Sequence, residues 1–114
     1  MVTAPSRSWD VNEALEVLSN ERRRIVLEEL LERRRPVPVA ELVDSVVAAE
    51  SNDRGRPNDL RTEVVLSLHH NHLPKLDRSK IIDHDTERGL IAVREAMYAV
   101  EPYLELSRND GRRG

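Results

Sequence analysis

The sequence predicts a mainly α-helical domain with one small β-hairpin, and three observations support this expectation. Apolar residues recur with helical spacing in several segments of the chain. Two aliphatic runs between residues 81 and 93 flank a turn that contains a glycine. With 114 residues and 39% hydrophobic content, the chain has material for one core only. We therefore expect one domain over residues 9–106, between disordered tails at residues 1–8 and 107–114.

The composition excludes several classes of protein. The chain has no Phe and one Trp, so aliphatic side chains must build the core, which suits small packed helices better than a sheet that encloses a ligand. It has no Cys, which excludes disulfides and thiol chemistry and agrees with a reducing compartment. No segment approaches the roughly 20 apolar residues that span a bilayer. We expect a cytoplasmic protein that holds no cofactor and does not enter membranes.

The net charge of the chain disfavours binding to nucleic acid, whereas the type of its basic residues favours it. A net charge of −3 lacks the basic footprint of non-specific phosphate binding. Yet Lys75 and Lys80 are the only lysines among 18 basic residues, so nearly all the positive charge is guanidinium, which forms forked contacts with phosphate or guanine. A GC-rich genome or a salt-rich cytoplasm is the simpler explanation of this arginine bias.

Two helices are expected to open the domain. A first helix, from about Asp10 to Leu18, is predicted by apolar residues at positions i, i+3, i+4 and i+7, namely Val11, Ala14, Leu15 and Leu18. Ser19-Asn20 then offers a cap for a second helix, from Glu21 to about Arg34. The buried side of this second helix should hold Val26, Leu27, Leu30 and Leu31.

Two arginine triplets flank the second helix. Arg33–Arg35 lie in its last turn, where positive charge stabilises the helix dipole, so they need no ligand. Arg22–Arg24 lie near the unfavourable end and are the more interesting triplet. We expect a solvated surface there rather than a phosphate clamp.

A short strand and a third helix are predicted next. The extended run Pro36–Val39 suits an edge strand against the hairpin, because missing backbone donors do little harm at an edge. A helix from Ala40 to Glu50 should bury Leu42, Val43, Val46 and Val47. The polar segment Ser51–Asn58 is expected to be a loop, longer than the turn of a compact helix-turn-helix.

The fourth helix is expected from about Asp59 to His72, with Asn58 as its cap. At ~100° per residue, its broad buried side holds Val65, Leu66, Leu68, His69, His72, Leu73 and Leu76. Its outward side holds Glu63, Ser67, His70 and Asn71. Pro74 cannot donate to the carbonyl of His70, so the helix should break at Leu73 and restart as a short turn. The imidazole of His72 would satisfy the freed carbonyl.

The last elements are a hairpin and an apolar stripe. Strands over residues 81–84 and 90–93 enclose the turn Asp85–Gly89. Beyond them, an apolar stripe interrupted by Pro102 consists of Val93, Met97, Val100 and Leu104. So small a domain has no second core to receive this stripe, and we expect it to form the interface of a two-fold homodimer. The alternative is that the terminal helix folds back beside Val11 and Leu15 of its own domain.

This order of elements and two sequence segments suggest a family. The order helix, helix, strand, helix, helix, hairpin, helix is typical of a winged helix-turn-helix. Leu18–Arg23 reads Leu-Ser-Asn-Glu-Arg-Arg, and Leu68–Leu76 reads Leu-x-His-x-His-Leu-Pro-x-Leu. With these segments and Glu101–Leu104, the stretch from Trp9 to Leu106 resembles an uncharacterised haloarchaeal winged-helix family. The resemblance implies a winged-helix fold and a role as a DNA-binding regulator.

We therefore expect a homodimeric transcriptional regulator that binds double-stranded DNA. The helix at residues 59–72 would enter the major groove, and the hairpin at residues 81–93 would be the wing. The expected DNA contacts are phosphate-holding side chains at the start of the helix (Arg54, Arg56, Arg61), base-reading side chains on its outward side (Ser67, His70, Asn71) and a wing residue (Arg88). The alternative is a winged-helix protein-interaction module without DNA affinity, which the acidic balance of the chain permits.

The four histidines raise the question of a metal site, since imidazole is a common zinc ligand. His70 and His72 are two residues apart and point to different sides of a helix. His69 and His72 would need a further carboxylate, or His84, to complete a site. We therefore expect structural histidines, with a zinc site or a DNA contact through His70 as alternatives. The chain has no phosphate loop, nucleophile elbow or cysteine, and we expect that it is not an enzyme.

Overall fold

The computed structural model describes residues 11–51 and 57–113, and every structural statement below concerns these residues. They form, in order, α1 (Val11–Leu18), α2 (Glu21–Arg33), β1 (Val37–Pro38), α3 (Val39–Glu50), α4 (Pro57–Ser67), the π-helix η2 (Leu68–His72), α5 (Leu73–Arg78), β2 (Ile82–Asp85), β3 (Leu90–Val93) and α6 (Met97–Arg113). The protein is thus mainly helical with a small three-stranded antiparallel sheet in the order β1-β3-β2. This confirms the predicted fold class, and the arrangement is winged-helix-like.

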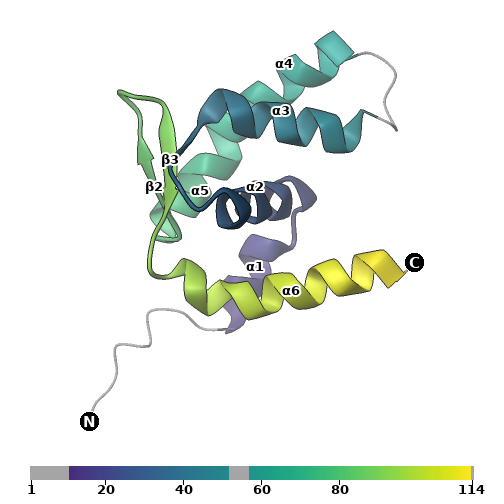
Figure 1. Cartoon of the computed structure of the whole chain (residues 1–114), viewed down its shortest axis with the longest axis vertical. Helices are drawn as coiled ribbons and strands as arrows, with labels where there is room; N and C mark the ends of the chain where they lie inside the picture. Colours follow the sequence, from purple (N-terminus) through teal and green to yellow (C-terminus); the bar gives the residue numbers. More distant parts are fainter. Residues whose placement is uncertain (1–10, 52–56, 114) are drawn as a thin grey trace.

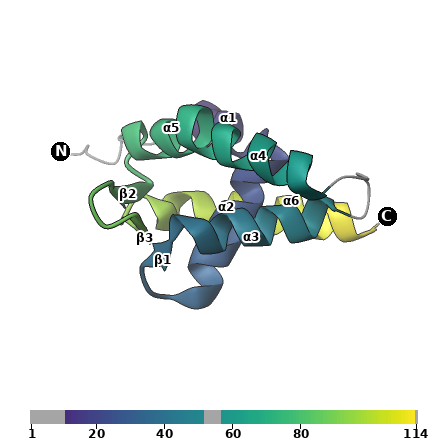
Figure 2. The same cartoon turned by 90° about the horizontal axis from the view of Figure 1, so that it is seen from above.

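The helices stack along the longest axis of the molecule, with the sheet at one side (Figure 1). α3 and α4 form one end, α2 lies in the middle, and α6 with α1 forms the other end. Seen from above, α4 and α5 run as one rod along one long side, while α3 lies on the other (Figure 2). No helix in the described part of the chain has the length and apolar character needed to cross a membrane.

The first two helices follow the prediction with one correction. Asn20 caps α2, because its side-chain oxygen accepts a hydrogen bond of 3.1 Å from the backbone N–H of Arg23. In α1, however, Val11 and Leu15 are exposed and Val17 is buried instead. The helix turns the side through Ala14, Val17 and Leu18 towards the core, and it packs against α2 and α6. The apolar spacing in the sequence therefore predicted a buried side of α1 that is rotated about the helix axis from the side that the structure buries.

The edge strand and the hairpin are confirmed, since β2 pairs with β3 in antiparallel register. β1 pairs with β3 through Val37 and Ile91, and Pro38, which has no N–H to donate, lies at the sheet edge. The backbone N–H of Val39 donates to the carbonyl of Gly89 (2.9 Å), which joins the start of α3 to the wing turn. Gly89 has a φ of +66°, a left-handed conformation that glycine adopts without strain.

The helical rod formed by α4, η2 and α5 differs from the predicted fourth helix at both ends. Asn58 lies inside α4 rather than capping it, because the helix begins at Pro57, and proline suits a first helical position. Nor does the helix break before Pro74. It widens into the π-turn η2, in which the N–H of Leu73 donates to the carbonyl of Leu68, and it continues as α5. Pro74 then falls in the first turn of α5, where its missing N–H matters least.

The terminal apolar stripe is buried within its own domain. Met97, Val100 and Leu104 belong to the core, and Val93 is half-buried against it. The assignment of these four residues to a dimer interface is therefore wrong in its premise, because α6 lies along α1 and contributes to the same core. α6 also continues through Pro102 to Arg113, past Ser107, where the sequence predicted a tail.

Candidate nucleic-acid interface

The outward face of α4 is set by the side that it buries. Leu60, Val64 and Leu68 lie four residues apart and pack into the core. The exposed row on the opposite side runs through Thr62, Leu66 and His69. Leu66 and His69 were predicted to be buried, and both predictions are wrong.

The three predicted base-reading residues do not share one environment. His70 and Asn71 are exposed in the π-turn, whereas Ser67 is half-buried. The wider π-turn rotates the helix relative to a regular 3.6-residue spacing, so the wheel drawn from sequence loses register after Ser67. His70 and Asn71 are therefore exposed in the π-turn that follows α4, and the helical wheel of α4 does not assign them to the row of Thr62, Leu66 and His69.

Three arginines were predicted to hold phosphates. The structure describes one of them, Arg61, whereas Arg54 and Arg56 lie outside the described residues. Arg61 projects from α4 towards α3, and its Nη1 atom donates to Oδ1 of Asp44 at 2.7 Å. Both side chains are exposed to solvent, so the pair is screened and contributes little to stability. Its consequence is local, since Asp44 neutralises the guanidinium that would meet a phosphate.

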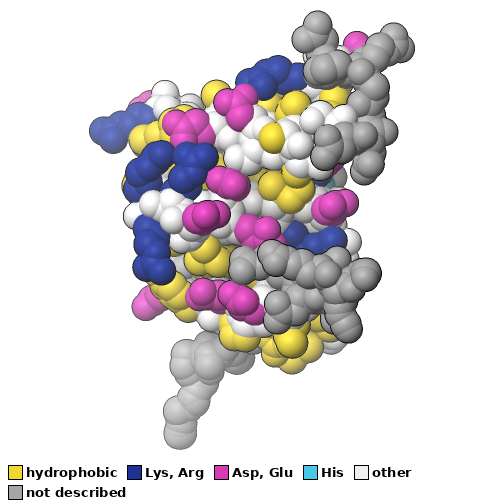
Figure 3. Space-filling view, turned by 45° about the vertical axis from the view of Figure 1, so that its right-hand side comes forward, with side chains coloured by type: hydrophobic (Ala, Val, Ile, Leu, Met, Phe, Trp, Pro, Cys, Tyr) yellow, Lys and Arg dark blue, Asp and Glu magenta, His cyan; other side chains and the backbone are white. Residues whose placement is uncertain are grey.

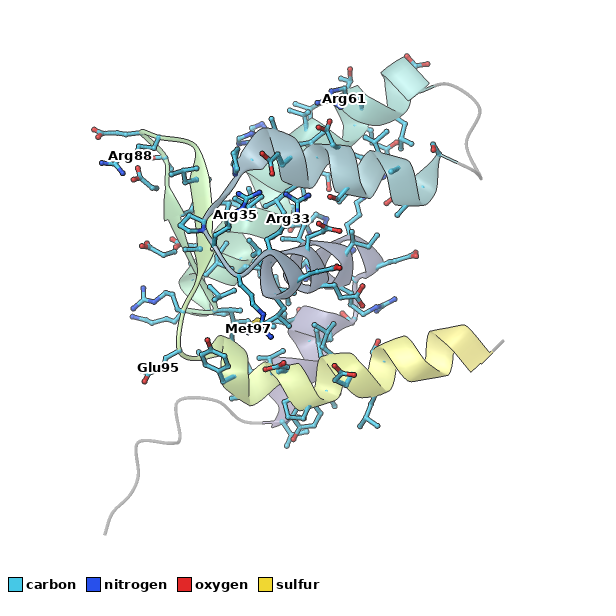
Figure 4. The ribbon with its side chains drawn as sticks, viewed as in Figure 1. Arg33, Arg35, Arg61, Arg88, Glu95 and Met97 are labelled. Carbon is cyan, nitrogen blue, oxygen red and sulfur yellow. The ribbon has the colours of Figure 1, made fainter. Side chains whose placement is uncertain are left out.

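The wing carries Arg88 at its turn. The side chain is 75% exposed, and its Nε atom lies 3.8 Å from a carboxylate oxygen of Asp85. Arg88 at the hairpin tip and Arg61 on α4 lie towards the same end of the molecule (Figure 4). The helix and the wing therefore each present a guanidinium at that end.

Other arginines are committed to contacts within the chain. Arg33 pairs with Glu29 and Glu41, and Arg35 also reaches Glu41 at 3.4 Å. The hydrogen bond to Glu41 and the nearby carboxylates raise the pKa of Arg33. The space-filling view shows basic and acidic side chains interleaved rather than separated into fields (Figure 3). The face of the molecule that Figure 3 shows thus has no continuous basic patch among its described residues.

The arginine triplet at the start of α2 is internal, contrary to the predicted solvated surface. Arg22 Nε donates to Glu50 at 2.7 Å, and its Nη2 atom lies 3.2 Å from Glu63 of α4. The hydrogen bond to Glu50 raises the pKa of Arg22. Arg24 donates to the carbonyl of Leu18 at 2.6 Å. The triplet therefore ties α2 to α1, α3 and α4.

Arg23 is the residue that sequence reasoning missed. Its exposure is 6%, although it is a charged residue, and its guanidinium donates to the carbonyls of Val17 (2.7 Å) and Glu16 (3.0 Å). Burial lowers its pKa. The signal was present in the sequence, because Arg23 stands at the i position of the stripe that continues through Val26, Leu27 and Leu30.

His72 is a structural histidine, as predicted, but its partner is different. The ring is 3% exposed, and its Nδ1 atom lies 3.1 Å from Nη1 of Arg23, not against the carbonyl of His70. Burial, followed by the charges of Arg23 and Arg22, lowers the pKa of His72 to about 4. No group of three His, Asp or Glu side chains suited to a metal ion occurs among residues 11–51 and 57–113.

A groove between α2 and α6 lies away from the exposed row of α4. Four carboxylates line it, those of Glu28, Glu32, Glu101 and Glu105. Such a lining repels phosphate, so the nucleic-acid candidate remains the α4 face and the wing.

Residues 15–92 of the chain match the model of a domain family described as a domain of unknown function (DUF7344). The match includes α2 to β2 whole, the second half of α1, most of β3, and both the Leu18–Arg23 and the Leu68–Leu76 segments. The chain matches no curated protein and no solved structure.

Proposed function

The chain belongs to the DUF7344 family, a family of domains of unknown function, and from the geometry of this chain we propose that it is a transcriptional regulator that binds double-stranded DNA. α4 would enter the major groove as the recognition helix, and the β2–β3 hairpin would be the wing. One observation carries the proposal. Thr62, Leu66 and His69 form an exposed row on α4, and the hairpin, which packs against α5 at the end of the same helical rod, carries an exposed arginine at its turn.

The phosphate contacts of this proposal come from arginines at that end of the molecule. Arg88 has a long exposed side chain and only a weak contact with Asp85, so it can turn to the DNA backbone. Arg61 must first leave Asp44, and the exposed ion pair makes that exchange inexpensive in free energy. Arg54 and Arg56, which precede α4 in the sequence and lie outside the described residues, complete the proposed phosphate-holding set. Base reading would fall to the exposed row of α4 and to His70 and Asn71.

The experiment that tests the proposal is a selection of binding duplexes from a random library, followed by titration at several salt concentrations. We expect an enriched sequence and a linear loss of affinity with the logarithm of salt concentration. The Arg61→Ala variant should lower the salt slope by roughly 1 and weaken all duplexes about equally. Recovery of no enriched sequence, with no measurable binding to mixed duplex at low salt, would refute DNA binding.

A second candidate is a winged-helix module that binds another protein. The observation that favours it is the pairing of surface cations, since Arg33, Arg35 and Arg61 each contact a carboxylate of the same chain. Such a surface has little excess positive charge to release counterions from DNA. The selection experiment separates the two candidates, because a protein-interaction module enriches no duplex.

We also propose that the protein is a homodimer, through a surface different from the buried terminal stripe. Exposed apolar side chains remain on α1, at Val11 and Leu15, and on α6, at Leu106. Hydrophobic side chains gather along the lower edge of the molecule in Figure 3, at the end where Figure 1 shows α1 and α6. Light scattering should report a dimer that Leu15→Glu converts to a folded monomer. A wild-type monomer at high concentration would overturn this part of the proposal.

A further inference from the structure

Leu66 is an unusual side chain for its position. Among the described residues, the exposed large apolar side chains are Val11, Leu15, Leu66, Tyr98 and Leu106. Four of these five lie on α1 or α6, and Leu66 alone lies on α4, with 54% of its surface exposed. It therefore stands apart from the apolar surface at the other end of the molecule.

The placement of Leu66 is fixed by the packing of its own helix. Val64 and Leu68 lie two residues to either side of it and are fully buried. At ~100° per residue, a position two residues away lies on the far side of the helix. Leu66 therefore occupies the outermost position of the exposed row, between Thr62 and His69.

That position restricts what Leu66 can contact in a DNA complex. A helix docked in the major groove brings its outermost side chains against the edges of the bases. Leucine has no donor or acceptor, so it cannot form the hydrogen bonds by which polar side chains read those edges. The C5-methyl group of thymine is the apolar group that bases display in the major groove.

We propose that Leu66 is a specificity-determining residue that reads the methyl group of a thymine. This inference rests on the proposed DNA-binding function and adds to it one residue and one base. The site bound by this protein then contains a thymine at the position that faces the middle of α4. Thr62 and His69 are exposed on either side of Leu66 in the same row, so in this complex they would face the neighbouring base pairs.

The test uses the duplex that the wild-type protein selects from the random library. Each thymine is replaced in turn by deoxyuridine, which lacks only the C5-methyl group. Wild-type affinity should fall about fourfold at one position, as expected for the loss of one buried methyl group. The Leu66→Ala variant should bind the thymine duplex more weakly and lose its response to deoxyuridine at that same position.

Tyr98→Ala is the control, because Tyr98 is another exposed large apolar side chain (62%), it lies on α6 away from α4, and it is not among the residues of the proposed dimer surface. It should keep the wild-type response to every deoxyuridine substitution. The inference is overturned if the selected site contains no thymine, if no substitution weakens wild-type binding by more than twofold, or if Leu66→Ala responds as the wild type does. In these outcomes DNA binding itself stands, whereas a protein that selects no duplex removes the proposed function and this inference together.

Discussion

Arg23 and His72 meet inside the domain although they are 49 residues apart in the sequence, with Nη1 of the arginine 3.1 Å from Nδ1 of the histidine. A guanidinium only donates, so Nδ1 accepts and the proton of the neutral ring lies on Nε2. The same guanidinium holds the last carbonyls of α1, at Glu16 and Val17. The buried guanidinium of Arg23 thus connects the C-terminus of α1, the first turn of α2 and the π-turn η2 between α4 and α5.

The first prediction concerns the stability that Arg23 provides. Arg23→Met keeps a long apolar stem but removes every donor, which leaves two α1 carbonyls and the His72 ring without this partner. The free energy of unfolding should fall by about 3 kcal/mol, since each unsatisfied buried group costs on the order of 1–3 kcal/mol. Denaturant titration measures this. Arg78→Met, at an exposed position, is the control and should change stability by less than ~0.5 kcal/mol.

The second prediction is a loss of stability in mild acid. The pKa of His72 is about 4 in the folded protein against an ordinary value of 6.5, because burial and the arginine charges disfavour the imidazolium. Between these two values the unfolded chain binds a proton that the folded chain does not, so stability falls as the pH drops from 6.5 to about 4. The fall should total at most roughly 3 kcal/mol for this group.

The variant that checks this assignment is His72→Asn, which retains an acceptor near the Nδ1 position but does not titrate. Its unfolding free energy, measured from pH 7 to pH 4, should vary less than that of the wild type. A variant with an unchanged pH dependence would show that carboxylates, not His72, control stability in this range.

The third prediction separates the buried stripe of α6 from its exposed side. Val100 is fully buried, so Val100→Glu places a carboxylate in the core and should unfold the domain. Leu106→Glu, at an exposed position of the same helix, should leave the fold intact. Circular dichroism and melting temperature compare the two variants. A folded, monomeric Val100→Glu protein would restore the stripe as an interface.

The fourth prediction concerns the ion pair that holds Arg61. Asp44→Asn removes the carboxylate that contacts Arg61 and adds one unit of net positive charge to the proposed DNA face. Affinity for all duplexes should rise several-fold, and the salt slope should increase by up to roughly 1. Glu29→Gln is the control, because it makes the same charge change beside Arg33 of α2. Equal effects of the two variants would indicate a general charge effect and not a contact through Arg61.

Local chemistry in the sequence was sufficient for most of the elements. The Asn20 cap, the edge strand beside Pro38 and the glycine-containing wing turn each follow from residues within one short segment. These features depend on backbone donors, acceptors and dihedral preferences, which neighbouring residues determine. The buried side of α4 was predicted only in part, because Leu68 was expected there, whereas Val64 was not and Leu66 was placed there wrongly.

Tertiary structure alone decided the rest, because burial depends on which surfaces meet. The α6 stripe at Met97 and Val100 has an apolar pattern that suits an interface and a core equally, and the position of α1 made it core. Arg23 was assigned to a solvated surface and His72 to a buried side without this partner, and the tertiary structure buries both because each satisfies the other across 49 residues. The outward position of Leu66 depended likewise on how α4 packs, since an apolar residue in a helical wheel gives no sign that it faces solvent.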